Sequence, residues 1–369
     1  MDWCSYITVY SKGGWQPIKT ATDMETIIKT IDPKNIDMDI IEEFGKMLAD
    51  GKTVIFPTET VYGLGANALD EDAAAKIYEA KGRPSDNPLL VHISDKEDLD
   101  ALVEDVDERA KVLIDKFWPG PLTIVFNKKE IIPDRTSGGL NTVAIRMPSD
   151  EIARKLIRAS KVPIAAPSAN ISGKPSPTKA EHIINDMEGR VDAILVGEDC
   201  NYGVESTIID LSGECPLVLR PGCITLEMLR EVLGKVEIDP SIMNKDDNRK
   251  AKAPGMKYKH YSPNAEVYIV VGENEKRIKK INELIEENSQ KGLKTGVLCM
   301  KHNSSRYNAK TFDLGESYEE AAHKLFDELI NLDNMGIDIA YAENFEEKGV
   351  GVAIMNRLKK SAAYRIIEA

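Results

Sequence analysis

The chain has 369 residues, too many for one ordinary hydrophobic core and enough for two domains. Its composition, 42% hydrophobic and 30% charged, is that of a globular protein, and no apolar run approaches the roughly 18 residues of a membrane span. The formal net charge of −13 argues against non-specific nucleic-acid binding, so an anionic ligand would need a local basic cluster.

The five cysteines are scattered, and no two of them have the CxxC spacing. This pattern argues against a disulfide framework and against a cysteine zinc site. The first residues lack the basic region and apolar core of a secretory signal. We therefore expect a protein of the reducing cytoplasm.

In chain order, the first predicted elements are an edge strand at Tyr6–Tyr10 and a helix at Asp37–Asp50, which Gly51 ends. A strand at Val54–Phe56 follows, and then a polar turn with two glycines at Thr58–Gly65. This strand and turn begin a unit that we expect to organise the rest of the domain.

The same unit continues with a helix from about Asp70 to Ala80, capped by Gly82, and a strand at Leu89–Ile93. Helices and strands then alternate to Leu233. The further helices are predicted at Asp95–Lys116, Ile152–Ser160 and Leu226–Leu233, and the strands at Leu122–Phe126, Thr142–Met147, Val162–Ala166, Ile194–Gly197, Ser206–Asp210 and Leu217–Arg220.

The pattern changes after residue 238. Residues 239–264 are polar and show no apolar periodicity, and Ser241–His260 carries six Lys or Arg against two Asp. Strands and helices alternate again in residues 265–369. We therefore predict an α/β fold with a twisted open sheet in residues 1–238 (core from about 33), a linker, and a small Rossmann-like α/β/α domain of three layers.

Two cations flank the helix cap at Gly82: Lys81 lies in the last turn before it, and Arg83 lies just beyond it. Cations at a helix C-terminus each gain about 0.3–1 kcal/mol from the dipole, which would explain either one alone. It would not explain why Pro84 and Pro88 stiffen this loop around Asn87. A rigid loop with Lys, Arg and Asn suits a triphosphate.

Two further polar residues lie in strands that are otherwise apolar. A histidine such as His92 is more often a satisfied core group than a catalyst. Arg146 needs an anion, which a protein carboxylate or a ligand carboxylate could supply.

The segment Pro167–Thr178 follows a buried strand and offers Ser168, Asn170 and Ser176 where ligands bind in open α/β sheets. The chain has no P-loop, GxGxxG, HExxH or GxSxG motif, and no side chains are predicted to form a metal site.

Seven stretches together resemble the threonylcarbamoyl-AMP synthase family in its two-domain form, from about Ile36 to the end: FPTETVYGLGANA, KGRPSDNPLLVHI, SGGLNTVAIRMP, APSANISGKPSPT, VESTIID, LRPG and PGMKYKHYSP. The resemblance implies a YrdC-like first domain with a deep cavity. It also implies synthesis of threonylcarbamoyl-AMP and pyrophosphate from L-threonine, bicarbonate or CO2, and ATP. A partner transferase complex would then use the product to modify the adenosine beside the anticodon of tRNAs.

The resemblance also assigns residues. Threonine would be surrounded by Thr60, His92, Arg146, Ala166 and Ser206. ATP would be held by Arg83, Asn87, Thr142, Ser168, Ser176, Arg220 and Tyr261, with Tyr258 as the alternative tyrosine. Lys81 and Arg83 would position the phosphates, with Mg²⁺ beside Lys81, and the HYSP motif of the linker would close over the nucleotide.

Three other functions fit parts of the sequence. The first is an RNA-binding module, against which the net charge argues. The second is the carbamoylation domain of hydrogenase maturation proteins, which carries zinc-binding cysteine pairs that are missing here. The third is a regulatory nucleotide-binding protein without catalysis, although every motif position is filled.

Overall fold

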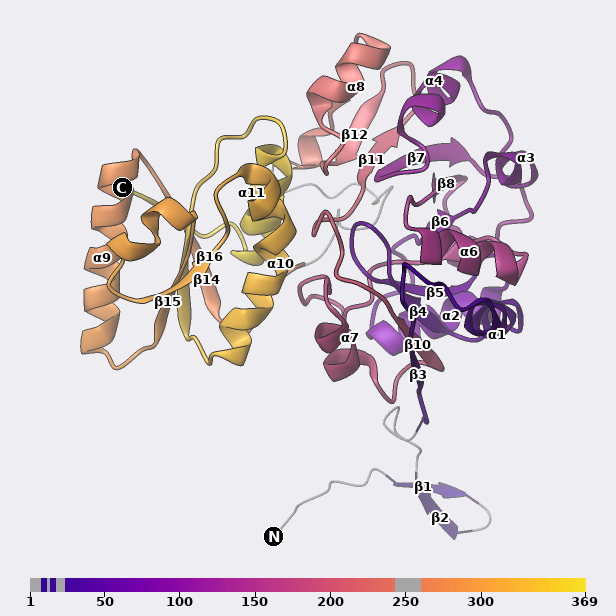
Figure 1. The fold of residues 1–369 in the computed structure, drawn as a ribbon, viewed down its shortest axis with the longest axis horizontal. Helices are drawn as coiled ribbons and strands as arrows, with labels where there is room; N and C mark the ends of the chain where they lie inside the picture. The colour runs from indigo at the N-terminus through magenta and orange to yellow at the C-terminus, as the bar shows by residue number, and fades with distance from the viewer. Residues whose placement is uncertain (1–7, 12–13, 18–23, 243–259) are drawn as a thin grey trace.

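The computed structural model describes residues 8–11, 14–17, 24–242 and 260–369, whose strands form three sheets (Figure 1). One sheet is the antiparallel pair of β1 (Thr8–Ser11) and β2 (Gly14–Pro17). The others have eleven and five strands. Within the described ranges, no helix has both the length and the apolar character needed to cross a membrane.

The large sheet has the strand order β13-β12-β11-β7-β8-β6-β9-β5-β4-β10-β3, with parallel and antiparallel pairs. Its strands are β3 (Ile27–Thr30), β4 (Val54–Phe56), β5 (Gly63–Asn67), β6 (Leu90–His92), β7 (Leu122–Asn127), β8 (Thr142–Arg146), β9 (Ile164–Ala165), β10 (Ala193–Val196), β11 (Thr207–Asp210), β12 (Leu217–Arg220) and β13 (Glu237–Ile238). The helices of this part are α1 (Met38–Ala49), α2 (Glu71–Lys81), η2 (Lys96–Asp98), α3 (Leu99–Leu102), α4 (Glu108–Phe117), α5 (Asp134–Ser137), α6 (Glu151–Ser160), α7 (Ala180–Met187), α8 (Leu226–Leu233) and η3 (Pro240–Ile242).

Both faces of β4 are buried, because successive side chains of a strand point to opposite faces. Val54 and Phe56 pack in one apolar cluster with helices α1 and α6, whereas Ile55 packs in another with α2 and α4. A strand covered on both faces reads as a continuous apolar run, which is why β4 could be predicted. The predicted open α/β sheet is confirmed.

Two predicted elements were wrong. The glycine-containing turn is in part the buried strand β5, and its position between β4 and β9 requires Gly65. A Cβ there would lie 2.6 Å from Phe56 Cε1 and 2.9 Å from Ile164 Cγ2. The helix predicted at Asp95–Lys116 is interrupted at Val103, which turns extended and forms a bridge to Lys128.

The small sheet is parallel and has the order β16-β15-β17-β14-β18. Its strands are β14 (Glu266–Val271), β15 (Thr295–Cys299), β16 (Lys310–Asp313), β17 (Ile339–Glu343) and β18 (Ile366–Glu368), and its helices are α9 (Asn274–Gln290), η4 (Lys301–Arg306), α10 (Tyr318–Asn334) and α11 (Gly351–Ser361). Helix α9 covers one face, and α10 and α11 cover the other. The predicted three layers are confirmed, with β16 and β18 as additional strands.

Helices α10 and α11 are the layer that faces the large sheet domain (Figure 1). Val61 and Val204 of the first domain pack in the same apolar cluster as these helices. Residues 243–259 of the predicted linker, including Tyr258, lie outside the described ranges. His260 and Tyr261 of the HYSP motif are described.

Candidate active site

A cavity of about 690 Å³, including its open mouth, lies at the ends of the central strands of the large sheet. Four basic side chains and the carboxylate of Glu205 line it. The full lining is Thr58, Thr60, Val61, Gly63, Lys81, Arg83, Leu90, His92, Arg146, Ala166, Pro167, Ser168, Asn170, Ser172, Gly173, Glu205, Ser206, Arg220, His260 and Tyr261. Polar groups that converge in one concave site suit a small polar ligand.

Ten of the predicted site residues line this cavity together: Lys81, Arg83, Thr60, His92, Arg146, Ala166, Ser168, Ser206, Arg220 and Tyr261. Asn87, Thr142 and Ser176 do not. Asn87 is buried beneath Arg83, Thr142 lies at the opposite end of β8 from Arg146, and Ser176 donates to the cavity residue Glu205 at 2.6 Å.

Strand register explains why residues distant in the sequence meet here. His92 and Arg146 are the last residues of the parallel strands β6 and β8 and face each other in register. Thr123 of β7 is the antiparallel partner of Arg146 on its other side. An antiparallel bridge between Gly63 and Ser168 brings the start of β5 and the loop after β9 to the same end of the sheet.

Arg146 is buried and has an anionic partner within the protein. Its Nη2 lies 2.7 Å from Glu59 Oε1, its Nη1 donates to Thr60 Oγ1 at 2.9 Å, and its Nε donates to the Gly120 carbonyl at 3.2 Å. Burial alone would raise the pKa of Glu59, but Arg146 and the Ser149 amide hold that pKa below its ordinary value. The sequence allowed either a protein carboxylate or a ligand carboxylate as the partner of Arg146. In the structure, the partner is the protein carboxylate of Glu59.

Lys81 is buried and holds the loop after β9. Its ammonium donates to the carbonyl of Ser168, to the carbonyl of Asn170 at 2.7 Å and to Asn170 Oδ1 at 3.3 Å. Burial, together with the nearby Arg83, lowers the pKa of Lys81 well below its ordinary value. All three acceptors belong to the cavity wall, so Lys81 fixes the position of Ser168 and Asn170 in the cavity.

Arg83 follows α2 and is partly exposed at the cavity. Its Nη2 lies 3.3 Å from the Pro88 carbonyl and 3.5 Å from the Asn87 carbonyl, so the loop stiffened by the two prolines supports the guanidinium. The buried side-chain amide of Asn87 has no hydrogen-bond partner among the described residues. An unsatisfied buried amide at this position leaves donors and an acceptor for a ligand.

His92 is a neutral imidazole in this site. Burial, and after it the positive charge of Arg146, lowers its pKa to about 3. Its Nδ1 is buried and has no hydrogen-bond partner in the described part of the chain. His92 can therefore contact a ligand through a neutral ring.

Glu205 lines the cavity with its carboxylate. It was not predicted as a site residue, although it directly precedes the predicted residue Ser206 in the motif VESTIID. Ser176 donates to its Oε1, and Arg357 of α11 lies 3.0 Å from its Oε2. Burial opposes ionisation, but Arg357 and Arg220 outweigh burial and lower the pKa of Glu205 to about 2. No local motif marks Arg357.

Arg220 lies beside this carboxylate and supports the wall of the cavity. It donates from Nε to the Ser206 carbonyl at 2.9 Å and from Nη2 to Ser206 Oγ at 3.0 Å. Ser206 Oγ is also 2.7 Å from Thr123 Oγ1. The two neighbouring hydroxyls and the guanidinium thus form one hydrogen-bonded group at the ends of β7, β11 and β12.

Tyr261 closes one side of the cavity. Its backbone has a φ of +61°, which is uncommon for a side chain other than glycine. The ring packs on Phe326 of α10 with centroids 5.0 Å apart, and the Arg357 guanidinium lies 5.9 Å from its centroid. The second domain therefore fixes the one predicted tyrosine that the structure describes.

The cavity offers few carboxylates for a metal ion. Among described residues, the one group of three or more metal-ligand side chains lies elsewhere, and the cavity carboxylate Glu205 is already paired with Arg357. Mg²⁺ commonly keeps several waters and binds through substrate phosphates. The hydroxyl and amide oxygens present would fit an ion that is held mainly by the phosphates of a ligand.

Comparison with known proteins shows the family. A family model described as telomere recombination matches residues 46–222, and one described as the C-terminal domain of threonylcarbamoyl-AMP synthase matches residues 224–363. The chain is 52% identical over 322 residues to threonylcarbamoyl-AMP synthase of Pyrococcus abyssi, covering 87% of this chain and 93% of the relative. It is 45% identical over 349 residues to that of Bacillus subtilis, covering 94% and 97%.

A solved structure agrees with these relatives. The crystal structure of P. abyssi Sua5 complexed with L-threonine has a TM-score of 0.89 and 49% sequence identity, covering 93% of this chain and 100% of that chain. These matches span both domains and confirm the resemblance seen in the sequence. The chain belongs to the threonylcarbamoyl-AMP synthase family in its two-domain form, a family of nucleotidyltransferase enzymes.

Proposed function

We propose that this chain makes threonylcarbamoyl-AMP and pyrophosphate from L-threonine, bicarbonate or CO2, and ATP. The observation that carries the proposal is the gathering of Arg83, Arg146 and Arg220 with hydroxyls in one cavity of a protein whose net charge is −13. The high similarity to a protein crystallised with L-threonine supports the same reading.

Threonine would bind among Thr60, His92, Arg146, Ala166 and Ser206, which lie together in the cavity. Arginine has five N–H donors, and protein atoms engage Arg146 from three of its nitrogens, which leaves N–H groups for a ligand carboxylate. Since Glu59 already balances its charge, Arg146 would orient threonine by directional hydrogen bonds more than by net charge.

ATP would bind beside threonine, with Arg83 and Arg220 at the phosphates and Tyr261 at the nucleotide. Asn87, Ser168 and Ser176 would contribute polar groups around them, as would Thr142, although it begins β8 away from the cavity lining. Lys81 would act on the phosphates by holding the loop of Ser168. Mg²⁺ would neutralise phosphate charge when bound with ATP.

The reaction needs positioning and charge neutralisation more than a strong base. The threonine amine attacks CO2 and loses a proton to give a carbamate. A carbamate oxygen then attacks the α-phosphorus of ATP, and the bond to the β-phosphate oxygen breaks with release of pyrophosphate. A neutral His92 agrees with a site in which the nucleophile is already anionic.

We propose that the product goes to a cytoplasmic transferase complex that modifies the adenosine beside the anticodon of tRNAs. The deciding experiment measures pyrophosphate release from ATP while threonine or bicarbonate is left out in turn. Release should require both. Release without threonine would contradict the proposal.

A further inference from the structure

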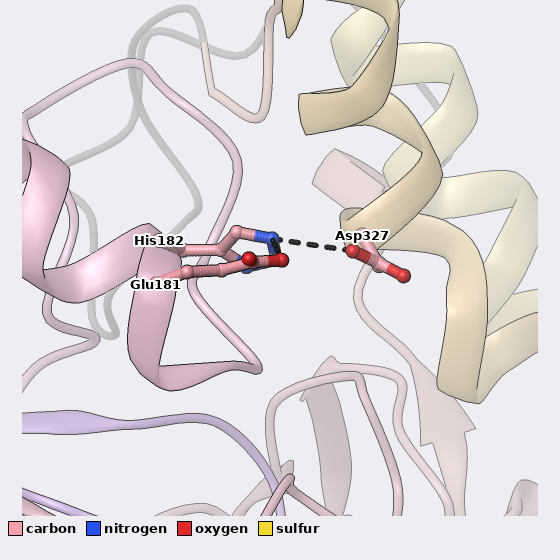
Figure 2. Close-up of side chains that lie close together, drawn as sticks. All are labelled: Glu181, His182 and Asp327. Carbon is pink, nitrogen blue, oxygen red and sulfur yellow. Dashed lines mark ion pairs between the residues drawn. The ribbon is translucent and has the colours of Figure 1, made fainter.

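Three side chains with metal-ligand atoms converge between the two domains, away from the cavity. Glu181 and His182 are neighbours on α7, and Asp327 comes from α10 (Figure 2). His182 Nε2 lies 3.2 Å from Asp327 Oδ1 and 3.9 Å from Glu181 Oε1. One ligand atom from each residue lies within 4.8 Å of the other two.

The closest contact in the group is the ion pair of His182 Nε2 with Asp327 Oδ1, and it does not satisfy the buried imidazole. The side chain of His182 is only 3% exposed, yet neither ring nitrogen has a hydrogen-bond partner among the described residues. The same is true of Asp327 Oδ1, although it is 3.2 Å from the imidazole. Buried polar atoms without partners are costly, so the arrangement points to a missing ligand.

The spacing matches a metal ion. Bonds of about 2.0–2.1 Å in a tetrahedral zinc site place neighbouring ligand atoms about 3.3 Å apart. The His182–Asp327 distance of 3.2 Å fits this spacing as it stands. Glu181, whose ligand atom lies 3.9 Å from His182 and within 4.8 Å of that of Asp327, has an exposed side chain that can move closer. One imidazole nitrogen with two carboxylate oxygens suits zinc or a similar transition-metal ion.

The surroundings support the same ligand. Lys179 Nζ lies 2.8 Å from Asp327 Oδ2, so it orients the carboxylate and leaves Oδ1 directed at His182. Metal ligands are commonly oriented by such outer contacts. The Glu181 side chain is 71% exposed, which provides a route from solvent and room for a water ligand.

We propose that Glu181, His182 and Asp327 bind a divalent transition-metal ion, best fitted by Zn²⁺, that ties the catalytic domain to the C-terminal domain. The ion fixes α10, whose Phe326 packs on Tyr261 at the cavity. It also fixes α7, which follows the cavity-lining segment that contains Ser168 and Gly173. Its role is structural and independent of the reaction proposed above.

The test titrates ZnCl2 into the full chain by calorimetry, after removal of metals with a chelator and without ATP. The test variant is His182→Gln. The control is His302→Gln, whose exposed imidazole lies in η4 of the C-terminal domain, away from the proposed site. We expect one equivalent of zinc to bind the wild type and His302→Gln. His182→Gln should bind zinc at least about 10–100-fold more weakly, which is the loss that removing an outer contact alone produces. Zinc should raise the unfolding temperature of the first two proteins only.

Zinc binding that is absent from the wild type, or unchanged in His182→Gln, would overturn the proposal. A wild-type unfolding temperature that zinc does not change would also overturn it, because His182 would then only pair with Asp327. If His182→Gln does not fold, Glu181→Gln decides by the same titration because its side chain is exposed. Weaker zinc binding by Glu181→Gln supports the site, and unchanged binding rejects it.

Discussion

Arg357 and Glu205 form a buried ion pair that joins the C-terminal domain to the wall of the active-site cavity, with Nη2 and Oε2 3.0 Å apart. Arg357 is fully buried and also donates to the Pro221 carbonyl. The other oxygen of Glu205 accepts from Ser176. The C-terminal domain thus supplies the counter-charge for a carboxylate of the site.

Replacing Arg357 with Met should lower the free energy of unfolding by about 3–5 kcal/mol, because Glu205 would remain buried without its partner. Urea denaturation measures this loss. The matched control is Arg306→Met, which breaks an exposed pair with Glu275 and should cost less than about 1 kcal/mol.

The double variant Arg357→Met with Glu205→Gln should recover part of that stability, since position 205 then carries no charge. The recovery should be incomplete because the buried Arg220 loses the carboxylate beside it. It should not restore activity if Glu205 positions Ser176 and Arg220 for ATP. Equal losses from Arg357→Met and Arg306→Met would contradict this account of the interface.

Arg83→Ala should reduce activity much more than stability. The guanidinium is partly exposed, and its contacts with the Pro88 and Asn87 carbonyls are long, 3.3 and 3.5 Å. We expect kcat/KM for ATP to fall about 100-fold or more, as when a preorganised donor to a charged group is removed. Unfolding free energy should change by less than about 1 kcal/mol. Parallel losses of activity and stability would show that Arg83 has a structural role.

His92 should make stability fall in mild acid. Its folded-state pKa of about 3 lies below the ordinary value of 6.5, so between these values the unfolded chain binds a proton that the folded protein does not. Stability is therefore fully kept above about pH 6.5 and lost as the pH falls toward 3. Each unit by which the pH falls in this window lowers the free energy of unfolding by about 1.4 kcal/mol.

Urea denaturation of the wild type and of His92→Gln measures the effect. Between about pH 7.5 and about pH 5, the wild type should lose about 2 kcal/mol more than the variant. The other four histidines are common to both proteins, so the difference isolates His92. Identical pH slopes would mean that the pKa of His92 is the same in the folded and the unfolded protein.

Gly65→Ala should destabilise the sheet beneath the site by about 1–3 kcal/mol, because the new Cβ would overlap Phe56 and Ile164. Gly213→Ala is the control, since the nearest atom to its Cβ would be 3.9 Å away in ordinary contact. Thermal unfolding of both variants tests the close approach. A Gly65→Ala protein as stable as the control would show that β4 and β9 can separate around the methyl group.

The sequence by itself determined most elements and the family. Strand Val54–Phe56 and helix Leu226–Leu233 were predicted with their observed bounds because apolar periodicity and helix stops are local signals. The motifs around Arg83, Arg146 and Ser168 were recognisable because each is a short continuous stretch. Ten of the residues selected from them line one cavity.

Only the tertiary structure decided which charges meet. Glu59 neutralises Arg146, and Arg357 reaches Glu205 across 152 positions of the chain. His182 and Asp327 meet only where α7 and α10 pack together. Strand β5 also had no local signal, because it contains Gly65, which the close approach of the neighbouring strands requires. Pairings of this kind depend on how distant elements are packed, and residue spacing in one sequence does not encode that distance.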